Sequence, residues 1–371
     1  MKVPWGMPYI GKEELDEIVD SVKSGWVTMG PKAAQFEKNI SEYIGVKHAI
    51  AVNSGTAALD IALKVMEIGP GDEVIIPAMT YIATANAVLF QGAKPVLADI
   101  EPRTYNLDPG DIGRRVTKKT KCIMPIDYGG QCADYDALEQ ICQDYRIPLV
   151  VDGAQSLGAE YKGRKACSFG EISITSFHAA KLITSVEGGM VFTNNDELAR
   201  KARIIRNQGE EQRYHHVLLG HNYRMSDLHA AVGLAQFRRI EKVIKKRQEL
   251  TQRYTNSLRE YSHLVTLPYV PPCNKHAWFR YTMVLDNRDQ VEKYLHEKGI
   301  DTRVCWPMPI HQQPLYQPLF NDAHHPVAEK FAKGSLDLPL YFSMTEAEQD
   351  YVIKHVTEAI EKFAKRRHEL T

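Results

Sequence analysis

The sequence predicts an α/β protein with a mostly parallel sheet between helices, followed by a smaller α+β domain. From residue 46 to 193, short apolar runs typical of strands alternate with helical patterns, as expected for a parallel sheet that is covered on both faces. The chain has 371 residues, which exceeds the usual size of one domain. Its composition changes after Pro268. We therefore place a large domain at residues 1–250 and a small C-terminal domain at residues 251–371.

The elements of the large domain follow one another in a regular order. Helices are expected at residues 57–66, 81–90 and 134–145. Only residues 178–188 separate the last two strands, so we expect that pair to be antiparallel or irregularly joined. Strands are expected where apolar runs are bounded by turn signals, at residues 48–52, 72–77, 95–100, 122–126, 149–152, 172–177 and 189–193.

The C-terminal third begins with a helix and continues as a small α+β unit. Residues 226–260 have the pattern of one long, charged amphipathic helix. Its basic residues favour a solvated face over a nucleic-acid patch. Strands at 280–285 and near 302–305 flank a helix at 289–298. The proline-spaced loop at 306–318 is long enough to suggest a functional role.

The composition argues against several classes of protein. Lys plus Arg and Asp plus Glu both total 46, so the zero net charge provides no field for nucleic acid or anionic membranes. No apolar run approaches the roughly 18 to 20 residues that span a bilayer. The N-terminus lacks the pattern of a secretory signal. We expect a cytoplasmic small-molecule enzyme without nucleic-acid or membrane partners.

Cysteine and histidine spacing gives no indication of a metal site. The histidine doublets 215–216 and 324–325 cannot share one helix face as an i, i+4 pair would. The cysteines form no C-x-x-C pair and have no zinc-ligand spacing, so we expect mostly reduced, partly buried thiols. They are Cys122, Cys132, Cys142, Cys167, Cys273 and Cys305.

A lysine that follows one predicted strand and an aspartate that ends another carry the most chemical information. Asp152 ends the apolar run 149–152, and Lys181 follows the run 172–177. Open α/β sheets bind ligands at the carboxyl ends of their strands. A lysine can form a Schiff base with pyridoxal phosphate (PLP), and a carboxylate can keep its ring nitrogen protonated. We therefore expect PLP as the cofactor, with Lys181 as Schiff-base lysine and proton carrier and Asp152 at the ring nitrogen.

Five further residues could complete a PLP site. Gly55 and Thr56 lie between a strand and a helix, where N–H groups and a hydroxyl can bind phosphate. Ser176 could add a hydroxyl, Tyr81 could stack on the ring, and Gln155 could reach the ring or its phenolic oxygen. Each residue alone is more simply explained as a helix cap, a core residue or a surface residue. Their order on successive elements favours the cofactor site.

Five motifs in order make the chain resemble the DegT/DnrJ/EryC1/StrS family of sugar aminotransferases, which have fold type I of the PLP enzymes. The resemblance covers nearly the whole length. It implies a mixed seven-stranded sheet and gives Lys181, Asp152, Tyr81, Gly55, Thr56 and Ser176 the cofactor roles described above. The motifs are residues 53–59, 69–74, 152–156, 176–181 together with 187–189, and 222–225.

The resemblance also implies a homodimer whose active sites lie at the subunit interface. In such a dimer, Asn222 would reach the phosphate bound by the other subunit. Lys181 distinguishes the chain from family members that carry histidine there and act as sugar dehydratases. Arg224 and His311 are candidate substrate contacts; a surface arginine and a loop histidine bonded to backbone are the simpler alternatives.

The implied activity is the transfer of an amino group from glutamate to a keto sugar nucleotide, with release of 2-oxoglutarate in a ping-pong mechanism. C4 is the expected position of the keto group and C3 the next. Such a reaction belongs to amino-sugar biosynthesis for polysaccharides or antibiotics. Two departures from the family pattern concern the substrate: residues 304–307 replace a common His-Tyr pair, and Leu182 follows the lysine where asparagine is common.

Two alternative functions use the same cofactor apparatus. A cyclitol aminotransferase would act on a ring without a nucleotide, so recognition of UDP, dTDP or GDP separates the two enzymes. A non-catalytic PLP-binding regulator would show no turnover. The chain has no evident DNA-binding domain or basic N-terminal arm, which disfavours the regulator.

Overall fold

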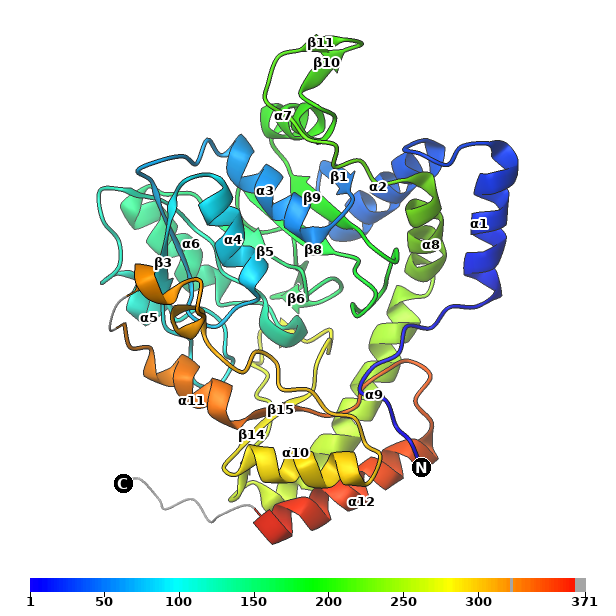
Figure 1. The fold of residues 1–371 in the computed structure, drawn as a ribbon, viewed down its shortest axis with the longest axis vertical. Helices are drawn as coiled ribbons and strands as arrows, with labels where there is room; N and C mark the ends of the chain where they lie inside the picture. Colours follow the sequence, from blue (N-terminus) through cyan, green and yellow to red (C-terminus); the bar gives the residue numbers. More distant parts are fainter. Residues whose placement is uncertain (321–322, 364–371) are drawn as a thin grey trace.

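A mixed β-sheet of seven strands forms the centre of the large part of the computed structural model, in the order β1-β9-β8-β5-β4-β2-β3 (Figure 1). The structure describes residues 1–320 and 323–363. Parallel bridges from Ile123 to Leu149 and from Ile126 to Asp152 join β4 to β5. The strands are β1 (His48–Val52), β2 (Glu73–Pro77), β3 (Lys94–Ala98), β4 (Thr120–Ile123), β5 (Val150–Asp152), β8 (Ile172–Ser176) and β9 (Gly189–Thr193).

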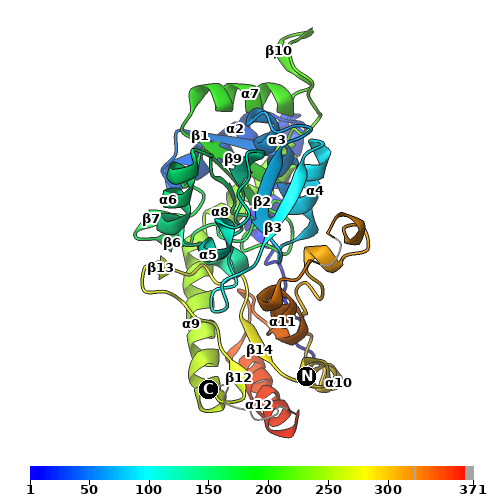
Figure 2. The same cartoon turned by 90° about the vertical axis from the view of Figure 1, so that its left-hand side faces the viewer.

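Helices cover both faces of this sheet because its strands are apolar on both sides. Every residue of β2, β8 and β9 is buried, as expected for a sheet with two covered faces. One core cluster contains residues of α3, α4 and α7, and a second contains residues of α2, α6 and α8 (Figure 2). The helices of this part are α1 (Lys12–Ser24), α2 (Pro31–Ile44), α3 (Gly55–Val65), α4 (Ile82–Phe90), α5 (Pro109–Ile112), α6 (Tyr135–Tyr145), α7 (Asp196–Arg206) and α8 (Asp227–Phe237).

The predicted α/β fold is confirmed. Each of the seven predicted strands is present, with its ends within three residues of the expected positions. The pair predicted to be antiparallel or irregularly joined is β8 and β9, and β9 is antiparallel to both of its neighbours. Residues 177–188 form the loop between them, and this loop contains Lys181.

A smaller α+β unit follows helix α9 (Ile240–Leu258). Its core cluster extends from Leu250 to Ile360 and also contains Val3, which pairs with Ile300. The domain boundary near residue 250 stays a prediction, and residues 364–371 of the predicted small domain lie outside the described residues. The antiparallel sheet of this unit has the order β12-β14-β15, with β12 (Val265–Thr266), β14 (Thr282–Leu285) and β15 (Ser335–Asp337), and its helices are α10 (Arg288–Glu297), α11 (Pro326–Gly334) and α12 (Glu346–Phe363).

The expectation of one long charged helix at residues 226–260 is wrong. The segment forms α8 and α9, and the chain leaves the helical conformation at Arg239, where φ is −112° and ψ is 8°. Helix α8 is largely buried, and only α9 has the charged amphipathic pattern. Asp227 at the start of α8 accepts hydrogen bonds from the N–H groups of Gly30 and Ala33 at the start of α2. Tertiary packing therefore divides the segment.

The expectation of a strand near residues 302–305 is also wrong. Arg303 forms only one isolated bridge, with Asp337. The third strand of the small sheet is instead β15, which pairs with β14 and follows directly on α11. Its three residues are too few to produce a strand pattern in the sequence.

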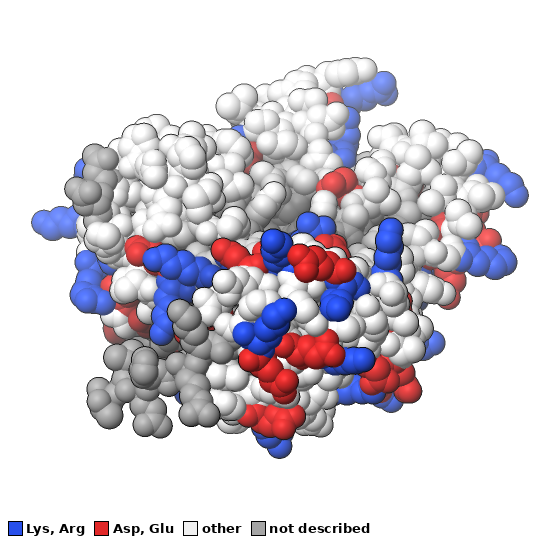
Figure 3. All heavy atoms as spheres, turned by 60° about the horizontal axis from the view of Figure 1, so that its bottom comes forward, with Lys and Arg blue, Asp and Glu red and all other residues white. Residues whose placement is uncertain are grey.

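Charged side chains of both signs mix on the face of the small unit that Figure 3 shows. Arg253 of α9 and Asp350 of α12 form one of the ion pairs of this unit. Because the two signs mix, the face in Figure 3 has no large region of a single charge sign.

No helix among the described residues is long and apolar enough to cross a membrane.

Candidate active site

Asp152 lies at the carboxyl end of β5 and is only 6% exposed. Its two oxygens accept hydrogen bonds from the Thr84 hydroxyl (2.8 Å) and from the N–H of Ala154 (3.1 Å). Burial raises the pKa of this carboxyl above its usual value, whereas both hydrogen bonds and the Lys181 charge act in the opposite direction. No described cation forms an ion pair with Asp152. The site therefore holds a buried carboxylate without a contacting positive charge.

Lys181 lies in the loop between β8 and β9 and is half-buried. The backbone N–H of Lys181 donates a hydrogen bond to the carbonyl oxygen of His178 at 2.9 Å, and this bond closes a turn. Its Nζ lies 5.0 Å from the centre of the Phe279 ring. Burial lowers the pKa of the amine to about 8, and the charge of Arg280 contributes in the same direction, against Asp152. A small cavity of about 10 Å³ is lined by Lys181, Gln155 and Ser176 among others.

The N-terminus of α3 and the end of β8 meet beside this lysine. Ser54 caps α3 by accepting a hydrogen bond from the N–H of Ala57 at 3.0 Å. A Cβ on Gly55 would lie 2.8 Å from the Cβ of Ser176, so only glycine allows this close approach. Thr56 is exposed in the first turn of the helix. The structure thus brings Gly55, Thr56 and Ser176 together at a helix end of positive polarity, which suits a phosphate.

Tyr81 and Gln155 also lie at the carboxyl edge of the sheet. Tyr81 is the N-cap residue of α4 and is 58% exposed, with its ring centre 6.5 Å from that of Trp306. Gln155 is buried, and its Oε1 accepts a hydrogen bond from the N–H of Gly129 at 3.0 Å. Its side-chain amide N–H groups are the ones left to donate to a ligand.

Asn222 and Arg224 lie on a strand-like segment beside β1. Asn222 is exposed and bridges the backbone of Asn207, while its carbonyl oxygen accepts a hydrogen bond from Asn53. Arg224 bridges Val52 and donates a hydrogen bond to the side chain of Asn207. These contacts do not join either residue to Lys181 of the same chain. Their roles stay predictions.

His311 is buried in the loop that follows Trp306. Its Nε2 lies 3.1 Å from Oε1 of Glu329, and its ring centre lies 5.0 Å from that of His325. Its Nδ1 is buried and has no hydrogen-bond partner. These contacts connect His311 with α11 rather than with the residues around Lys181, so its assignment as a substrate contact also stays a prediction.

Sequence reasoning missed three residues of this region. Thr84 comes from the alanine-rich helix α4, where a threonine gives no functional signal. Arg280 lies near Lys181 because both residues pack on Phe279. Trp306 contacts Tyr81, and the sequence marks it only as part of a departure from a family pattern.

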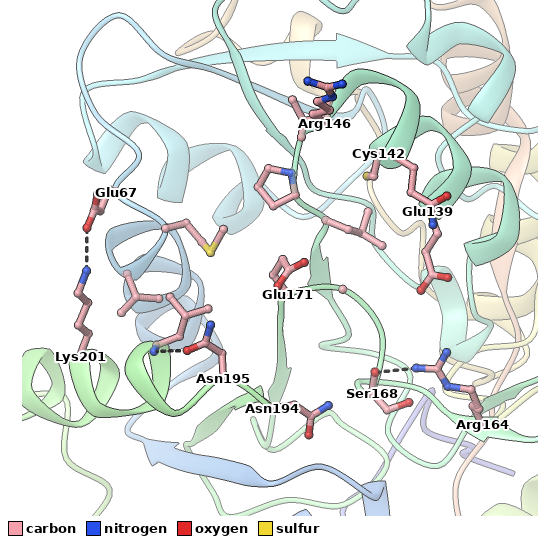
Figure 4. A pocket seen from close by; sticks show the side chains of 18 residues that line it. Glu67, Glu139, Cys142, Arg146, Arg164, Ser168, Glu171, Asn194, Asn195 and Lys201 are labelled. Atoms are coloured by element: carbon pink, nitrogen blue, oxygen red, sulfur yellow. Dashed lines mark hydrogen bonds and ion pairs between the residues drawn. The ribbon is translucent and has the colours of Figure 1, made fainter.

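A much larger cavity, of about 810 Å³, lies at the opposite edge of the sheet (Figure 4). It is lined by residues that precede β5 and β8 and that follow β9. Glu67 and Lys201 form an ion pair of 2.7 Å there, and Arg164 donates to the carbonyl oxygen of Ser168 at 3.1 Å. Its charged groups are therefore partly paired within the chain, and the parallel strands turn their amino ends toward it.

The carboxyl edge fits PLP better than this larger cavity does. Asp152 lacks a contacting cation, and the end of α3 favours an anion. PLP carries both missing charges, a ring nitrogen that can be protonated and a phosphate, and its aldehyde carbon can bond to a lysine amine. With this sheet architecture, the protein is a PLP-dependent enzyme of fold type I.

Comparison with known proteins identifies the family. The model of the DegT/DnrJ/EryC1/StrS aminotransferase family matches residues 8–357, and the chain belongs to this family. GDP-perosamine synthase of Caulobacter vibrioides is 40% identical over 354 residues, which cover 93% of this chain and 95% of that protein. UDP-2-acetamido-2-deoxy-3-oxo-D-glucuronate aminotransferase of Pseudomonas aeruginosa is 38% identical over 332 residues, which cover 89% and 91%.

A solved structure supports the same assignment. NtdA of Bacillus subtilis, crystallised with the bound cofactor PMP, aligns with a TM-score of 0.89 and 32% identity over 97% of this chain and 85% of that chain. The protein is thus a PLP-dependent transaminase, and the predicted family, fold type and cofactor are confirmed.

Proposed function

We propose that this aminotransferase transfers the amino group of glutamate to the keto group of a nucleotide-linked sugar and releases 2-oxoglutarate. A 4-keto sugar is our first choice and a 3-keto sugar our second. The observation that carries the proposal is the Lys181 amine, with its pKa lowered to about 8, near the buried carboxylate of Asp152. The names of the two relatives, one GDP-linked and one a UDP-linked 3-oxo sugar, support the substrate class.

Lys181 acts as the proton carrier. When bound, PLP supplies the electron sink that allows a C–H bond of the amino donor to break. The Nζ of Lys181 would take this proton, and it can do so only when it is uncharged. With a pKa of about 8, about one amine in ten is uncharged at pH 7, far more than for an ordinary lysine. Burial of Lys181 therefore prepares the base for its task.

Asp152 and the end of α3 hold the two ends of the cofactor. The carboxylate of Asp152 keeps a proton on the ring nitrogen, and Thr84 fixes its orientation through the 2.8 Å hydrogen bond. Gly55, Thr56 and Ser176 bind the phosphate. Held in this way, the cofactor would present the substrate carbon to Lys181, and such positioning is one way in which an enzyme raises a rate.

A homodimer with shared active sites completes the proposal. Helix α1 exposes a stripe of Leu15, Val19 and Val22, and Trp26 just beyond its end is exposed as well, with exposed fractions of 47 to 59%. Exposed apolar stripes of this kind mark interaction surfaces. Asn222 is exposed and bridges Asn207, which comes just before the projecting hairpin of β10 (Glu210–Gln212) and β11 (His215–His216) (Figure 1). From this segment Asn222 would reach the phosphate site of a second copy.

Two further residues are proposed as substrate contacts. Arg224 lies on the same segment as Asn222 and would act in the site of the second copy. His311 has an unpartnered Nδ1 that a substrate could bind. We place the enzyme in the cytoplasm, where its six free cysteines would stay reduced.

A panel of ketones tests the substrate. The purified enzyme is incubated with glutamate and with 4-keto and 3-keto sugars linked to UDP, dTDP or GDP, and the amino products are detected by mass spectrometry. A matched cyclitol ketone is the control. Preferential amination of the cyclitol would overturn the sugar-nucleotide assignment, and failure of every ketone would overturn the proposed reaction.

Subunit complementation tests the shared sites. Lys181→Ala and Asn222→Ala should each be inactive as pure dimers. In a mixed dimer, one site combines both lesions, whereas the other contains neither and regains activity. The control is a mixture of Lys181→Ala with wild-type subunits treated in the same way. If the two inactive variants gain nothing on mixing, each site is complete within one chain.

A further inference from the structure

Arg280 lies where the small unit meets the carboxyl edge of the large sheet. Its N–H donates to the carbonyl oxygen of Gly129 at 3.0 Å, and the N–H of Ala277 donates to that of Gly130 at 2.9 Å. These bonds attach the segment before β14 to the turn that follows β4. The side chain of Arg280 is 9% exposed. A nearly buried guanidinium is thus held at a fixed place in the junction.

Asp337, the partner of this guanidinium, occupies only part of the hydrogen-bonding capacity of Arg280. Nη1 of Arg280 donates to Oδ2 of Asp337 at 2.6 Å, and the other oxygen of Asp337 accepts a hydrogen bond from Thr282 at 2.5 Å. The Nε of Arg280 is buried and has no hydrogen-bond partner. An arginine that only balanced the charge of Asp337 could use two parallel hydrogen bonds instead. Arg280 also lies beside the Cys305 thiol, and its guanidinium has more N–H donors than these protein groups use.

Aromatic rings surround the rest of the guanidinium. Its Cζ lies 4.8 Å from the ring centre of Phe279 and 5.7 Å from those of Trp5 and Trp306. The backbone of Trp306 has a φ of 47°, a strained conformation for a bulky residue that is often found at ligand sites. Rings on several sides exclude water and strengthen electrostatic attraction to an anion.

This arginine and the reacting lysine share one neighbour. Nζ of Lys181 lies 5.0 Å from the centre of the same Phe279 ring. The charge of Arg280 lowers the pKa of Lys181, which agrees with two cations facing one region. The ring centre of Trp306 also lies 5.6 Å from that of Tyr128 and 6.5 Å from that of Tyr81. The Trp306 ring therefore lies between Arg280 and Tyr81, the residue expected to stack on the cofactor.

We propose that Arg280 binds a carboxylate of the substrate beside the Lys181 amine. Arginine presents a planar fork that matches a carboxylate, and an amino-acid donor carries its α-carboxylate on the carbon that bears the reacting amine. The carboxylate of an acidic sugar offers the same chemistry. The inference rests on the proposed aminotransfer, because it places the ligand within reach of Lys181. Asp337 acts as the positioning residue for the arginine.

The first test follows the half-reaction with the amino donor. Holoenzyme is mixed with glutamate alone, and the spectral change of the bound cofactor gives the half-saturating concentration. Arg280→Lys should raise this concentration roughly 10- to 100-fold, the range expected for a lost charged hydrogen bond. Isoglutamine, which has an amide in place of the α-carboxylate, should react equally with both enzymes. A variant with the same side-chain change elsewhere, Arg103→Lys, lies on the exposed side of the junction and should resemble wild type.

The same comparison with ketone substrates identifies the source of the carboxylate. If Arg280→Lys impairs a keto uronate but neither its neutral analogue nor glutamate, the sugar supplies the carboxylate. If neither carboxylate substrate is affected, the inference is overturned. Arg280→Met leaves Asp337 buried and unpaired, so the double variant Arg280→Met with Asp337→Asn and its melting temperature control for folding.

A readout without turnover separates this inference from the proposed function. Trp5 and Trp306 flank Arg280, so binding of 2-oxoglutarate should change the tryptophan fluorescence. Arg280→Lys should shift the titration midpoint by the same factor of roughly 10 to 100. Equal midpoints, together with an unaffected keto uronate, overturn the carboxylate site even in an active aminotransferase. A shifted midpoint supports it even where no ketone in the panel is aminated.

Discussion

The edge of the central sheet with the larger cavity is not the edge with the active site. The amino edge has a cavity of about 810 Å³, whereas the cavity beside Lys181 at the carboxyl edge measures only about 10 Å³. Yet Asp152 at the carboxyl edge is a buried carboxylate without an ion-pair partner among the described residues. At the amino edge, Glu67 has its partner in Lys201. Unused chemical capacity, rather than volume, distinguishes the active site.

Strand direction gives the physical reason for this difference. Six of the seven strands run the same way, so their carboxyl ends deliver side chains and helix N-termini to one edge. Asp152 and Ser176 end strands there, and α3 begins there with Gly55. The amino edge receives helix C-termini and loops, which do not favour an anionic ligand. Three predictions compare the two edges, and a fourth tests the burial of Lys181.

The largest difference is expected between the lysines of the two edges. Lys181→Ala should lower turnover at least about 10⁴-fold, because the same amine anchors the cofactor and carries the proton. It should also remove the visible absorption of lysine-bound PLP. Lys201→Ala, which removes an amine from the large cavity, should retain both. Loss of activity in Lys201→Ala at an unchanged melting temperature would mean that the amino edge also takes part in catalysis.

The second-largest loss of turnover is expected for a substitution of Asp152. Asp152→Asn keeps the size of the side chain but cannot hold a proton on the ring nitrogen, so we expect turnover to fall about 10²- to 10³-fold. PLP should still form its visible absorption band, since Lys181 is intact. Glu171→Gln makes the same change at the amino edge and should leave turnover within a factor of about two. Steady-state kinetics of both variants measure the contrast, and equal losses would contradict it.

Most of the sheet could be predicted from the sequence because its strands are continuous apolar runs that end in turns. The break between α8 and α9 could not, since Asp227 binds the backbone of Gly30, which is 197 positions away in the chain. Likewise, the short strand β15 depends on its pairing with β14. Local patterns reveal elements with their own periodicity and miss those that distant contacts define.

The same distinction applies to the site. Lys181 was predicted because it follows a strand and Asp152 because it ends one, so their location depends on local pattern. Thr84 bonds Asp152 across 68 positions, and Arg280 bonds Asp337 across 57. No local pattern joins such pairs, so the residues that position the chemistry appeared only in the structure.

Two glycines allow a third comparison of the edges. A Cβ on Gly55 would meet the Cβ of Ser176 at 2.8 Å, whereas a Cβ on Gly69, just before β2, would have no neighbour within 4 Å. Gly55→Ala should therefore displace the end of α3 and weaken PLP binding by roughly 10- to 100-fold, since overpacking costs about 1 to 3 kcal/mol. Gly69→Ala should bind PLP normally. Equilibrium titration of the apoenzymes with PLP measures both, and equal affinities would show that the phosphate does not depend on this contact.

The smallest expected effect concerns pH. Only the uncharged Lys181 amine can bond to PLP, and burial lowers its pKa to about 8. The rate at which the apoenzyme takes up PLP should therefore rise about ten-fold between pH 7 and 9 and level off above, whereas a lysine with the ordinary pKa near 10.4 would show a rise of about 100-fold and no plateau. Stopped-flow absorbance records this rate. Removing the positive charge of Arg280 should move the midpoint to higher pH, because that charge opposes protonation of Lys181. A midpoint near the ordinary value in the unmodified protein would mean that Lys181 is solvated, and the contrast between the edges would then rest on Asp152 alone.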